Sequence, residues 1–305
     1  MLNRIASVRR TFSTMTSQRW SRLIRFEDEH GKTHYGQPIL ENEELKQSDL
    51  KKGLKAHLVE GDVFGEHTVT DKSRTVKKLL APVTPSIIRC IGLNYRRHAQ
   101  ETGSKIPVKP ILFMKPPSSA CGPYDTIRVP HVAQDDMVDY EAELAVVIGK
   151  KCRDISKEQA LNYVAGYTIC NDVSSRNWQM GPKSGGQWNF SKGFDTFAPL
   201  GPMIVSSSVI TDPQTLKLGT RLDGQLLQDY TTSDMIFDVS TIVSFLSQGT
   251  TLMPGDVIIT GTPHGVGYTR SPPVLLKHGT KCEIYIERIG NIVNPVEYER
   301  GQSKL

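Results

Sequence analysis

The sequence predicts a strand-dominated α+β fold with a few short helices. Apolar or alternating runs typical of strands recur from residue 86 onwards, and the clearest are 141–149 (EAELAVVIG) and 281–290 (KCEIYIERIG). Apolar residues at helical spacing are rarer, and the best example is 237–249 (FDVSTIVSFLSQG), where Gly249 is expected to end the helix. Because helices do not alternate regularly with these strands, a doubly wound α/β sheet is not expected.

Three regions are expected along the chain. Residues 1–20 are predicted to be a targeting leader, residues 21–83 a small N-terminal β region, and residues 84–300 the catalytic domain. The stretch 79–86 (LLAPVTPS) carries two prolines and indicates the boundary between the last two regions. Within the catalytic domain, Asp223-Gly224 between two alternating segments predicts a hairpin turn.

The N-terminus is basic, whereas the rest of the chain is close to neutral. Residues 1–26 hold six arginines and no acidic residue, so the formal net charge falls from +5 to −1 without those arginines. A leader rich in Arg, Ser and Thr without a long apolar core is typical of mitochondrial import, so a matrix location is expected. The alternative is a disordered tail without a targeting function, with translation starting at Met15 to give a cytoplasmic form.

Composition and motifs argue against several classes of protein. The body of the chain has no basic footprint, so nucleic acid is not an expected partner. No apolar run approaches the ~18 residues that a membrane span needs, so no membrane partner is expected. Walker loops, the dinucleotide-binding fingerprint and the G-x-S-x-G elbow do not occur, and the five cysteines include no C-x-x-C pair.

Acidic side chains gather at the start of the predicted strand at 141–149. In an extended strand Asp139, Glu141 and Glu143 would lie on one face, because side chains two residues apart point the same way. Like charges at this spacing repel and burial increases the cost, so a divalent cation is the expected neutralising partner. The E-x-E spacing by itself fits carboxylates on a solvated strand face equally well.

A third ligand is expected from the end of a neighbouring strand. Asp172 follows the apolar segment 164–169 at the point where a strand gives way to a loop (YTICNDVSS). Three carboxylates with no His or Cys favour Mg²⁺ or Mn²⁺. A 2-oxo acid could then bind the cation through its carboxylate and keto oxygens, with the cation acting as a Lewis acid.

Six segments taken together resemble the fumarylacetoacetate hydrolase superfamily, from about residue 86 to residue 296. They are CIGLNYRRHAQETG (90–103), PILFMKPPSSACGPYDTI (110–127), DYEAELAVVIGKK (139–151), GYTICNDVSSRNWQM (166–180), SKGFDTFAPLGP (191–202) and PGDVIITGTPHGVG (254–267). The resemblance is strongest to the fumarylacetoacetate hydrolase domain-containing 2 branch. It implies a mixed β-sandwich or roll, usually a homodimer, that binds Mg²⁺ or Mn²⁺ through Glu141, Glu143 and Asp172.

The resemblance also implies roles for residues around the metal. A short lid helix would carry the dyad His98 and Glu101, in which Glu101 orients His98 and raises its basicity. Lys192 matches the family's active-site lysine, which would stabilise a developing enolate or a substrate carboxylate. The matched substrate-contacting positions are Arg176, Gln179 and Thr262.

Three reactions can branch from the enolate of a metal-chelated 2-oxo acid. Return of a proton gives keto–enol tautomerisation, loss of CO₂ gives decarboxylation, and attack by water activated by His98 cleaves an acylpyruvate. We expect an oxaloacetate enol–keto tautomerase, with an acylpyruvate hydrolase or oxaloacetate decarboxylase as the alternative. A non-catalytic metal- or ligand-binding protein of the same fold ranks last, because no matched ligand or dyad position is missing.

Overall fold

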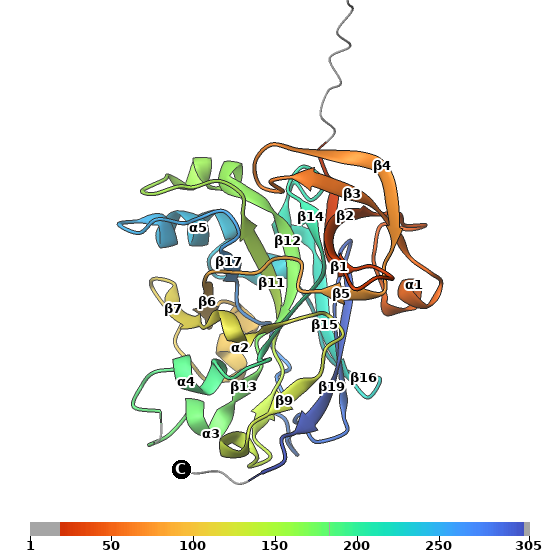
Figure 1. The fold of residues 1–305 in the computed structure, drawn as a ribbon. Coiled ribbons are helices and arrows are strands. Elements are labelled where there is room, and N and C mark those ends of the chain that lie inside the picture. Colours follow the sequence, from red (N-terminus) through yellow and green to blue (C-terminus); the bar gives the residue numbers. More distant parts are fainter. Residues whose placement is uncertain (1–18, 183, 302–305) are drawn as a thin grey trace, which may run out of the picture.

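The computed structural model describes residues 19–182 and 184–301 (Figure 1). Nearly all of the leader predicted at 1–20 therefore lies outside the described residues. Strands dominate the described part and its helices are short, which confirms the predicted α+β class. No helix within this part is long and apolar enough to cross a membrane.

A large twelve-stranded sheet forms the frame of the molecule. Its strands run in the order β4 (His67–Thr75), β3 (Lys55–Gly61), β2 (Thr33–Pro38), β1 (Arg22–Glu27), β14 (Ala198–Ser206), β12 (Val164–Asn171), β11 (Ala142–Ile148), β17 (Val257–Ile259), β6 (Ile88–Gly92) and β7 (Ile111–Lys115). Two further strands join beside this path, β5 (Lys78–Leu80) on β1 and β8 (Ala120–Cys121) on β14.

A second sheet and a short ribbon complete the strands. The second sheet has the order β16 (Gln225–Thr231), β15 (Lys217–Leu222), β18 (Lys281–Ile286), β19 (Gly290–Tyr298) and β9 (Ile127–Val129). The ribbon pairs β10 (Val138–Asp139) with β13 (Ser174–Ser175). The α-helices are α1 (Gln47–Lys51), α2 (Arg96–Glu101), α3 (Arg176–Gln179), α4 (Asn189–Lys192) and α5 (Val239–Ser247), and the 3₁₀ turns are η1 (Pro117–Ser119), η2 (His131–Ala133), η3 (Lys157–Tyr163), η4 (Pro213–Thr215) and η5 (Thr232–Asp234).

Strand β11 lies between two hydrophobic cores. Leu144 and Val146 belong to the core that includes Leu218 of the second sheet. Ala145 and Val147 point the opposite way, because successive side chains alternate across a strand, and they belong to the other core. Every residue of β11 is buried, including Glu143, and the apolar run 145–148 is the part for which the sequence predicts this. Two packed layers of strands around this element confirm the predicted β-sandwich or roll.

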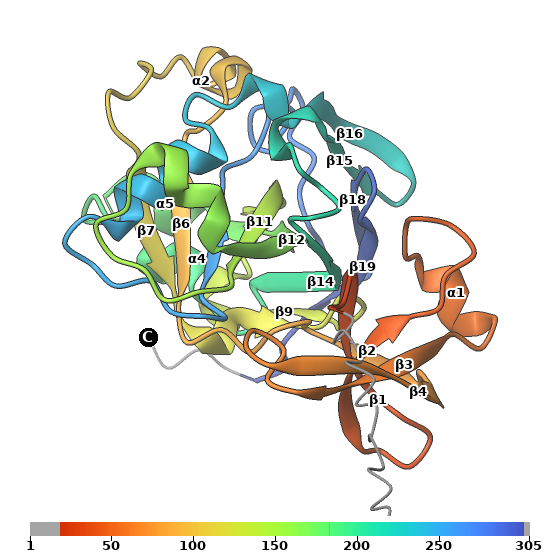
Figure 2. The same cartoon turned by 90° about the horizontal axis from the view of Figure 1, so that it is seen from above.

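The N-terminal strands continue the main sheet. β1 pairs antiparallel with β14, with Arg22 opposite Val205 and Leu23 opposite Ile204. Seen from above, β1–β4 and α1 lie on one side of the molecule, and α2, α4 and α5 lie on the other (Figure 2). The division at residue 83 stays a prediction.

Two local predictions from the sequence are confirmed. β15 and β16 form a hairpin whose turn residues Asp223 and Gly224 have φ of 50° and 87°, the left-handed values that Asp-Gly tolerates. Helix α5 begins after Asp238, whose side chain accepts a hydrogen bond from Thr241 N at 2.8 Å, and Gly249 follows its end with φ of 68°.

A buried ion pair joins two neighbouring parallel strands of the main sheet. Arg89 of β6 and Asp256, just before β17, lie 2.7 Å apart between Nη1 and Oδ2, and both side chains are buried. Asp256 also accepts hydrogen bonds from Ser86 Oγ at 2.7 Å and Met253 N at 3.0 Å. Removing the carboxylate would leave the buried Arg89 charge without an opposite charge, with only the Thr251 carbonyl oxygen at 3.4 Å as an acceptor.

We expect Asp256→Ala to lower the free energy of unfolding by about 3–5 kcal/mol, the usual cost of breaking a buried pair. The matched control is Glu60→Ala, which removes the exposed ion pair between Glu60 and Lys72 at 3.0 Å and should cost no more than about 1 kcal/mol. Urea unfolding of the two variants measures the difference. Equal losses in both would contradict the assignment of Arg89–Asp256 as a structural tie.

Candidate metal centre and active site

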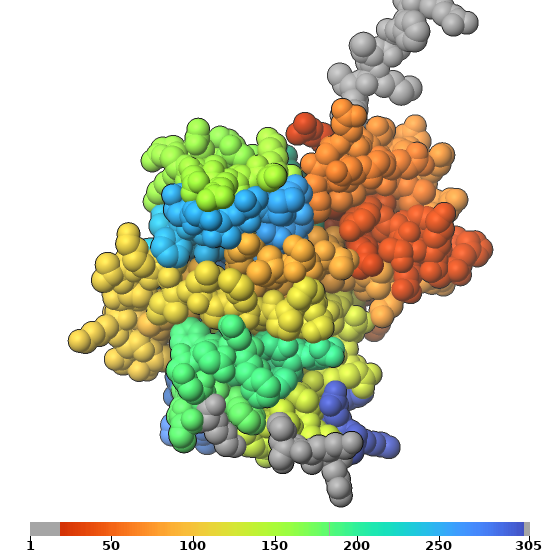
Figure 3. Space-filling model, turned by 60° about the vertical axis from the view of Figure 1, so that its left-hand side comes forward, coloured from red at the N-terminus to blue at the C-terminus, as the bar shows by residue number. Residues whose placement is uncertain are grey.

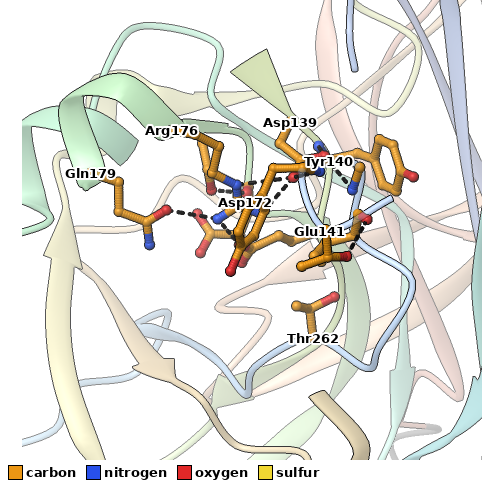
Figure 4. A network of polar contacts seen from close by, with 12 residues as sticks. Asp139, Tyr140, Glu141, Asp172, Arg176, Gln179 and Thr262 are labelled. Atoms are coloured by element: carbon orange, nitrogen blue, oxygen red, sulfur yellow. Dashed lines mark hydrogen bonds and ion pairs between the residues drawn. The ribbon is translucent and has the colours of Figure 1, made fainter. Parts of the chain in front are cut away.

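Antiparallel pairing of β11 and β12 brings the three predicted metal ligands together. Glu143 lies opposite Cys170, and one step further along, Asp172 N donates to Glu141 O at 3.0 Å. One carboxylate oxygen from each of Glu141, Glu143 and Asp172 lies within 4.8 Å of the others, and all three residues are buried. The close-up in Figure 4 shows Glu141 and Asp172 facing one another beside Arg176.

Asp139 departs from the expectation that it shares a face with Glu141 and Glu143. β10 ends at Asp139 and β11 begins at Ala142, so the extended strand is interrupted between them. Asp139 Oδ2 instead accepts from Arg176 Nε at 2.9 Å and Nη2 at 2.8 Å, and Oδ1 accepts from Gly267 N at 2.8 Å. Asp139 therefore belongs to an ion pair with Arg176 and is separate from the ligand cluster.

Two cations hold Glu141 ionised. Lys192 Nζ lies 2.9 Å from Glu141 Oε2, and Arg176 Nη1 lies 2.7 Å from Oε1. Burial would raise the pKa of Glu141, but Lys192 and Arg176 outweigh it and lower the pKa to about 2. Lys192 Nζ also donates to Asp172 Oδ2 at 2.7 Å and to Ser174 Oγ at 2.6 Å. Burial alone would lower the pKa of Lys192, but Asp172 and Glu141 raise it, so Lys192 carries a charge.

Lys115 is a residue of the site that the sequence analysis missed. It ends β7, it is 1% exposed, and its Nζ lies 2.7 Å from Asp172 Oδ1. Its donors are directed to the carbonyl oxygens of Val173, Lys192 and Phe197. A lysine directly after the apolar run ILFM is the signal in the sequence, because a buried lysine requires acceptors or an opposite charge.

The carboxylates retain unsatisfied capacity that a divalent cation fits. Asp172 Oδ1 is buried and accepts no hydrogen bond; Lys115 Nζ lies 2.7 Å away as an ion-pair partner, but its donors go to carbonyl groups. Glu143 Oε2 accepts from Gly261 N at 2.6 Å, yet Glu143 forms no ion pair with any described residue. Burial, followed by repulsion from Asp172 and Glu141, raises the pKa of Glu143 well above its usual value. Converging carboxylate oxygens are the donor set that Mg²⁺ and Mn²⁺ prefer.

The predicted dyad forms on helix α2. His98 Nδ1 lies 2.8 Å from Glu101 Oε2, and the other carboxylate oxygen accepts from Gly265 N at 2.8 Å and Thr269 Oγ1 at 2.9 Å. Burial would raise the pKa of Glu101, but the hydrogen bonds from His98, Gly265 and Thr269 lower it, so the carboxylate is ionised. An acceptor at Nδ1 places the hydrogen on Nδ1 in neutral His98 and leaves the Nε2 lone pair free.

A single cavity of about 260 Å³ connects the dyad to the carboxylates. The predicted residues that line it are His98, Glu141, Glu143, Asp172, Arg176, Gln179, Lys192 and Thr262, while Glu101 stands behind His98. Ile91, Phe113 and Trp188 contribute an apolar wall that the sequence analysis did not identify. On the surface, the yellow segment with α2 and β7 lies against the green segment with α4 (Figure 3).

Arg176 is held by groups of the protein on several sides. Besides Asp139 and Glu141, its Nη1 donates to Gln179 Oε1 at 2.7 Å, and its guanidinium lies 4.5 Å from the centre of the Tyr268 ring. Most of the guanidinium donors are therefore used within the protein. Gln179 accepts from Arg176 through its oxygen, which leaves the amide NH₂ of Gln179 for a ligand.

Comparison with known proteins places this chain in one family. The family described as "Fumarylacetoacetate (FAA) hydrolase C-terminal" matches residues 87–297. A Dictyostelium discoideum protein named "Fumarylacetoacetate hydrolase domain-containing protein 2 homolog" is 48% identical over 229 residues, covering 72% of this chain and 74% of that protein. The Homo sapiens protein named "Oxaloacetate tautomerase FAHD2A, mitochondrial" is 46% identical over 224 residues, covering 73% and 70%.

A solved structure extends the similarity to the whole fold. The crystal structure of 2-hydroxyhepta-2,4-diene-1,7-dioate isomerase from Mycobacterium marinum superposes with a TM-score of 0.77 at 38% identity, covering 92% of this chain and all of that one. The chain belongs to the fumarylacetoacetate hydrolase family. Within that family it is an enzyme of the branch that contains the domain-containing 2 proteins, as the sequence motifs predicted.

Replacing Glu143 with Gln should stabilise the metal-free protein in a pH-dependent way. Because the folded-state pKa of Glu143 is raised, the wild type loses stability as pH rises above the unfolded-state value of about 4.5. Glu143→Gln avoids this loss and keeps an acceptor for Gly261 N–H. Its advantage should grow by up to about 1.4 kcal/mol per pH unit between the two pKa values. Urea unfolding in EDTA from pH 5 to pH 8 measures it.

The same variant should lose its response to a divalent cation. Mg²⁺ is expected to raise the Tm of the wild type and to leave that of Glu143→Gln nearly unchanged, because one of three charged ligands is gone. Glu60→Gln, at an exposed carboxylate of β3, should match the wild type in both measurements. If the stability difference between Glu143→Gln and the wild type stays constant with pH, Glu143 is not a buried carboxylate with a raised pKa.

Proposed function

We propose that this enzyme is an Mg²⁺- or Mn²⁺-dependent oxaloacetate tautomerase. The observation that carries the proposal is that the cavity at the carboxylate triad also holds His98, whose free Nε2 can exchange a proton with a ligand there. Relatives at 45–48% identity support it, and most of them are named oxaloacetate tautomerase.

Glu141, Glu143 and Asp172 would hold the cation. When bound, the cation supplies Lewis-acid polarisation of the 2-oxo group and charge to offset a developing enolate. Lys192 adds positive charge at the same place, because its Nζ lies within 2.9 Å of both Glu141 and Asp172. Ile91, Phe113 and Trp188 form an apolar wall of the cavity, and the charged side chains are buried, so their charges act more strongly than they would in water.

His98 is the group that moves the proton. In the enol-to-keto direction, Nε2 accepts the proton of the C2 hydroxyl, and His98 returns a proton to C3, so the dyad ends in its starting state. Glu101 keeps the hydrogen on Nδ1 and stabilises the imidazolium that forms between the two transfers. Gln179 NH₂ and the Thr262 hydroxyl are the donors available to orient a carboxylate of the substrate.

Purified protein should accelerate the loss of enol-oxaloacetate, followed by ultraviolet absorbance, without release of pyruvate in a coupled assay. EDTA should abolish the acceleration, and Mg²⁺ or Mn²⁺ should restore it. Metal-dependent pyruvate release would favour the alternative, an oxaloacetate decarboxylase or acylpyruvate hydrolase. Stabilisation by Mg²⁺ and oxalate without turnover on any 2-oxo acid would favour a non-catalytic binding protein.

His98→Asn should lower kcat by about 10²–10⁴-fold, the usual contribution of a positioned general acid or base. Because His98 is not a ligand, the shift of Tm by Mg²⁺ should stay as in the wild type. His30→Asn, at an exposed histidine of the N-terminal region, is the control and should keep full activity. Unchanged kcat in His98→Asn would rule out the proton-transfer role.

We further infer a homodimer in the mitochondrial matrix. The resemblance to the family supports the dimer, and the basic leader together with relatives named mitochondrial supports the location. A fluorescent fusion of the full chain should accumulate in mitochondria, and a fusion that begins at Met15 should stay in the cytosol. Light scattering should give about twice the chain mass of 34.0 kDa. A cytosolic full-length fusion or a monomeric mass would refute the corresponding inference.

A further inference from the structure

Gln228, a buried residue of β16, connects the second sheet to the cavity. Its relative exposure is 0%, and it does not line the cavity itself. We propose that Gln228 is a positioning residue that fixes the hydroxyl of Thr262 as a hydrogen-bond donor to the substrate. This inference rests on the proposed function for the identity of the substrate, a 2-oxo acid with anionic oxygen atoms.

The amide of Gln228 has only one possible orientation. Oε1 accepts from Ala142 N at 3.0 Å and from Thr220 Oγ1 at 2.7 Å. Nε2 donates to Thr262 Oγ1 at 2.8 Å and to Pro263 O at 2.8 Å. A backbone N–H can only donate and a backbone carbonyl can only accept, so Ala142 and Pro263 determine which end of the amide is which. The NH₂ group therefore faces Thr262.

That orientation decides what Thr262 can offer. Because Thr262 Oγ1 accepts the hydrogen bond from Gln228, the hydroxyl hydrogen must point elsewhere. The hydroxyl donates to no described residue, although Thr262 is only 3% exposed and lines the cavity. A buried donor without a partner is costly, so it is expected to find an acceptor in the bound ligand. A carboxylate or enolate oxygen of the substrate is such an acceptor.

The Oε1 end of the Gln228 amide fixes the position of the Thr262 hydroxyl relative to the predicted metal ligands. Ala142, whose N–H binds Gln228 Oε1, lies between Glu141 and Glu143 on the ligand-bearing segment. A single side chain thus spans the backbone between two ligands and the hydroxyl of Thr262. The position of the Thr262 donor relative to the residues that would hold the cation is therefore set within the protein before substrate binds, and such an arrangement selects one orientation of a ligand.

Four variants test the proposal, with kcat/KM for enol-oxaloacetate and calorimetric affinity for oxalate in Mg²⁺ as readouts. Thr262→Val removes the donor, and Gln228→Met removes the group that orients it. Each should lower kcat/KM and oxalate affinity by about 10–100-fold, the value of a hydrogen bond to a charged group. Thr262→Ser keeps the hydroxyl and should stay within about threefold of the wild type. Thr220→Val, the matched control, removes a bond to the same amide on its far side and should retain kcat/KM and oxalate affinity.

The double variant Gln228→Met/Thr262→Val distinguishes positioning from general support of the fold. If Gln228 acts through Thr262, the double variant should be no worse than Thr262→Val alone. Losses that multiply, or equal losses in Thr220→Val and Gln228→Met, would overturn the proposal. Oxalate affinity does not depend on turnover. Absence of tautomerase activity with a non-additive loss of oxalate affinity would therefore reject the proposed function and keep this inference.

Discussion

Three carboxylates buried within one small space are the constraint on which the rest of the site depends. Glu141, Glu143 and Asp172 are buried, so they repel one another where water screens them poorly. Lys192 and Arg176 hold Glu141 ionised, and Lys115 lies beside Asp172. Glu143 is left with a backbone N–H as its donor. Lysine and arginine side chains thus stabilise two of the three carboxylates. The raised pKa of Glu143 reflects repulsion that a divalent cation would offset.

The fold can bury such a cluster because β11 is covered on both faces. One core lies against the second sheet. On the other face, β11 and its neighbouring strands form a core together with residues that lie outside those strands, among them Trp20, Val63 and Val83. The predicted ligands lie where β11 begins and β12 ends. The rest of each strand is mostly apolar, so the charges gather at the strand ends. Because the second sheet packs against β11, its residue Gln228 contacts both Ala142 N, between two predicted ligands, and Thr262 Oγ1, in the cavity wall.

The structure gives Arg176 more partners than its position in the sequence indicated. The family resemblance predicted only that Arg176 contacts the substrate. The structure adds Asp139, Gln179 and the Tyr268 ring around the same guanidinium. Asp139 also accepts from the backbone N–H groups of Gly267 and Tyr268, so it joins the arginine to the loop that follows Thr262. Asp139 thus both neutralises Arg176 and holds the loop at Gly267 and Tyr268 in place.

The sequence by itself determined the fold class, a helix within 237–249, the hairpin at Asp223-Gly224 and the grouping of Glu141, Glu143 and Asp172. These depend on periodicity, on turn chemistry and on motifs whose residues are close along the chain or at adjacent strand ends. Tertiary structure alone decided that Asp139 leaves the ligand face, that Lys115 lies beside Asp172, and that Gln228 orients Thr262. Each of these depends on which atoms meet across elements 30 or more residues apart, as in the 34 residues between Gln228 and Thr262. A local pattern can indicate that a lysine such as Lys115 needs acceptors, but it does not tell which atoms of distant elements will supply them.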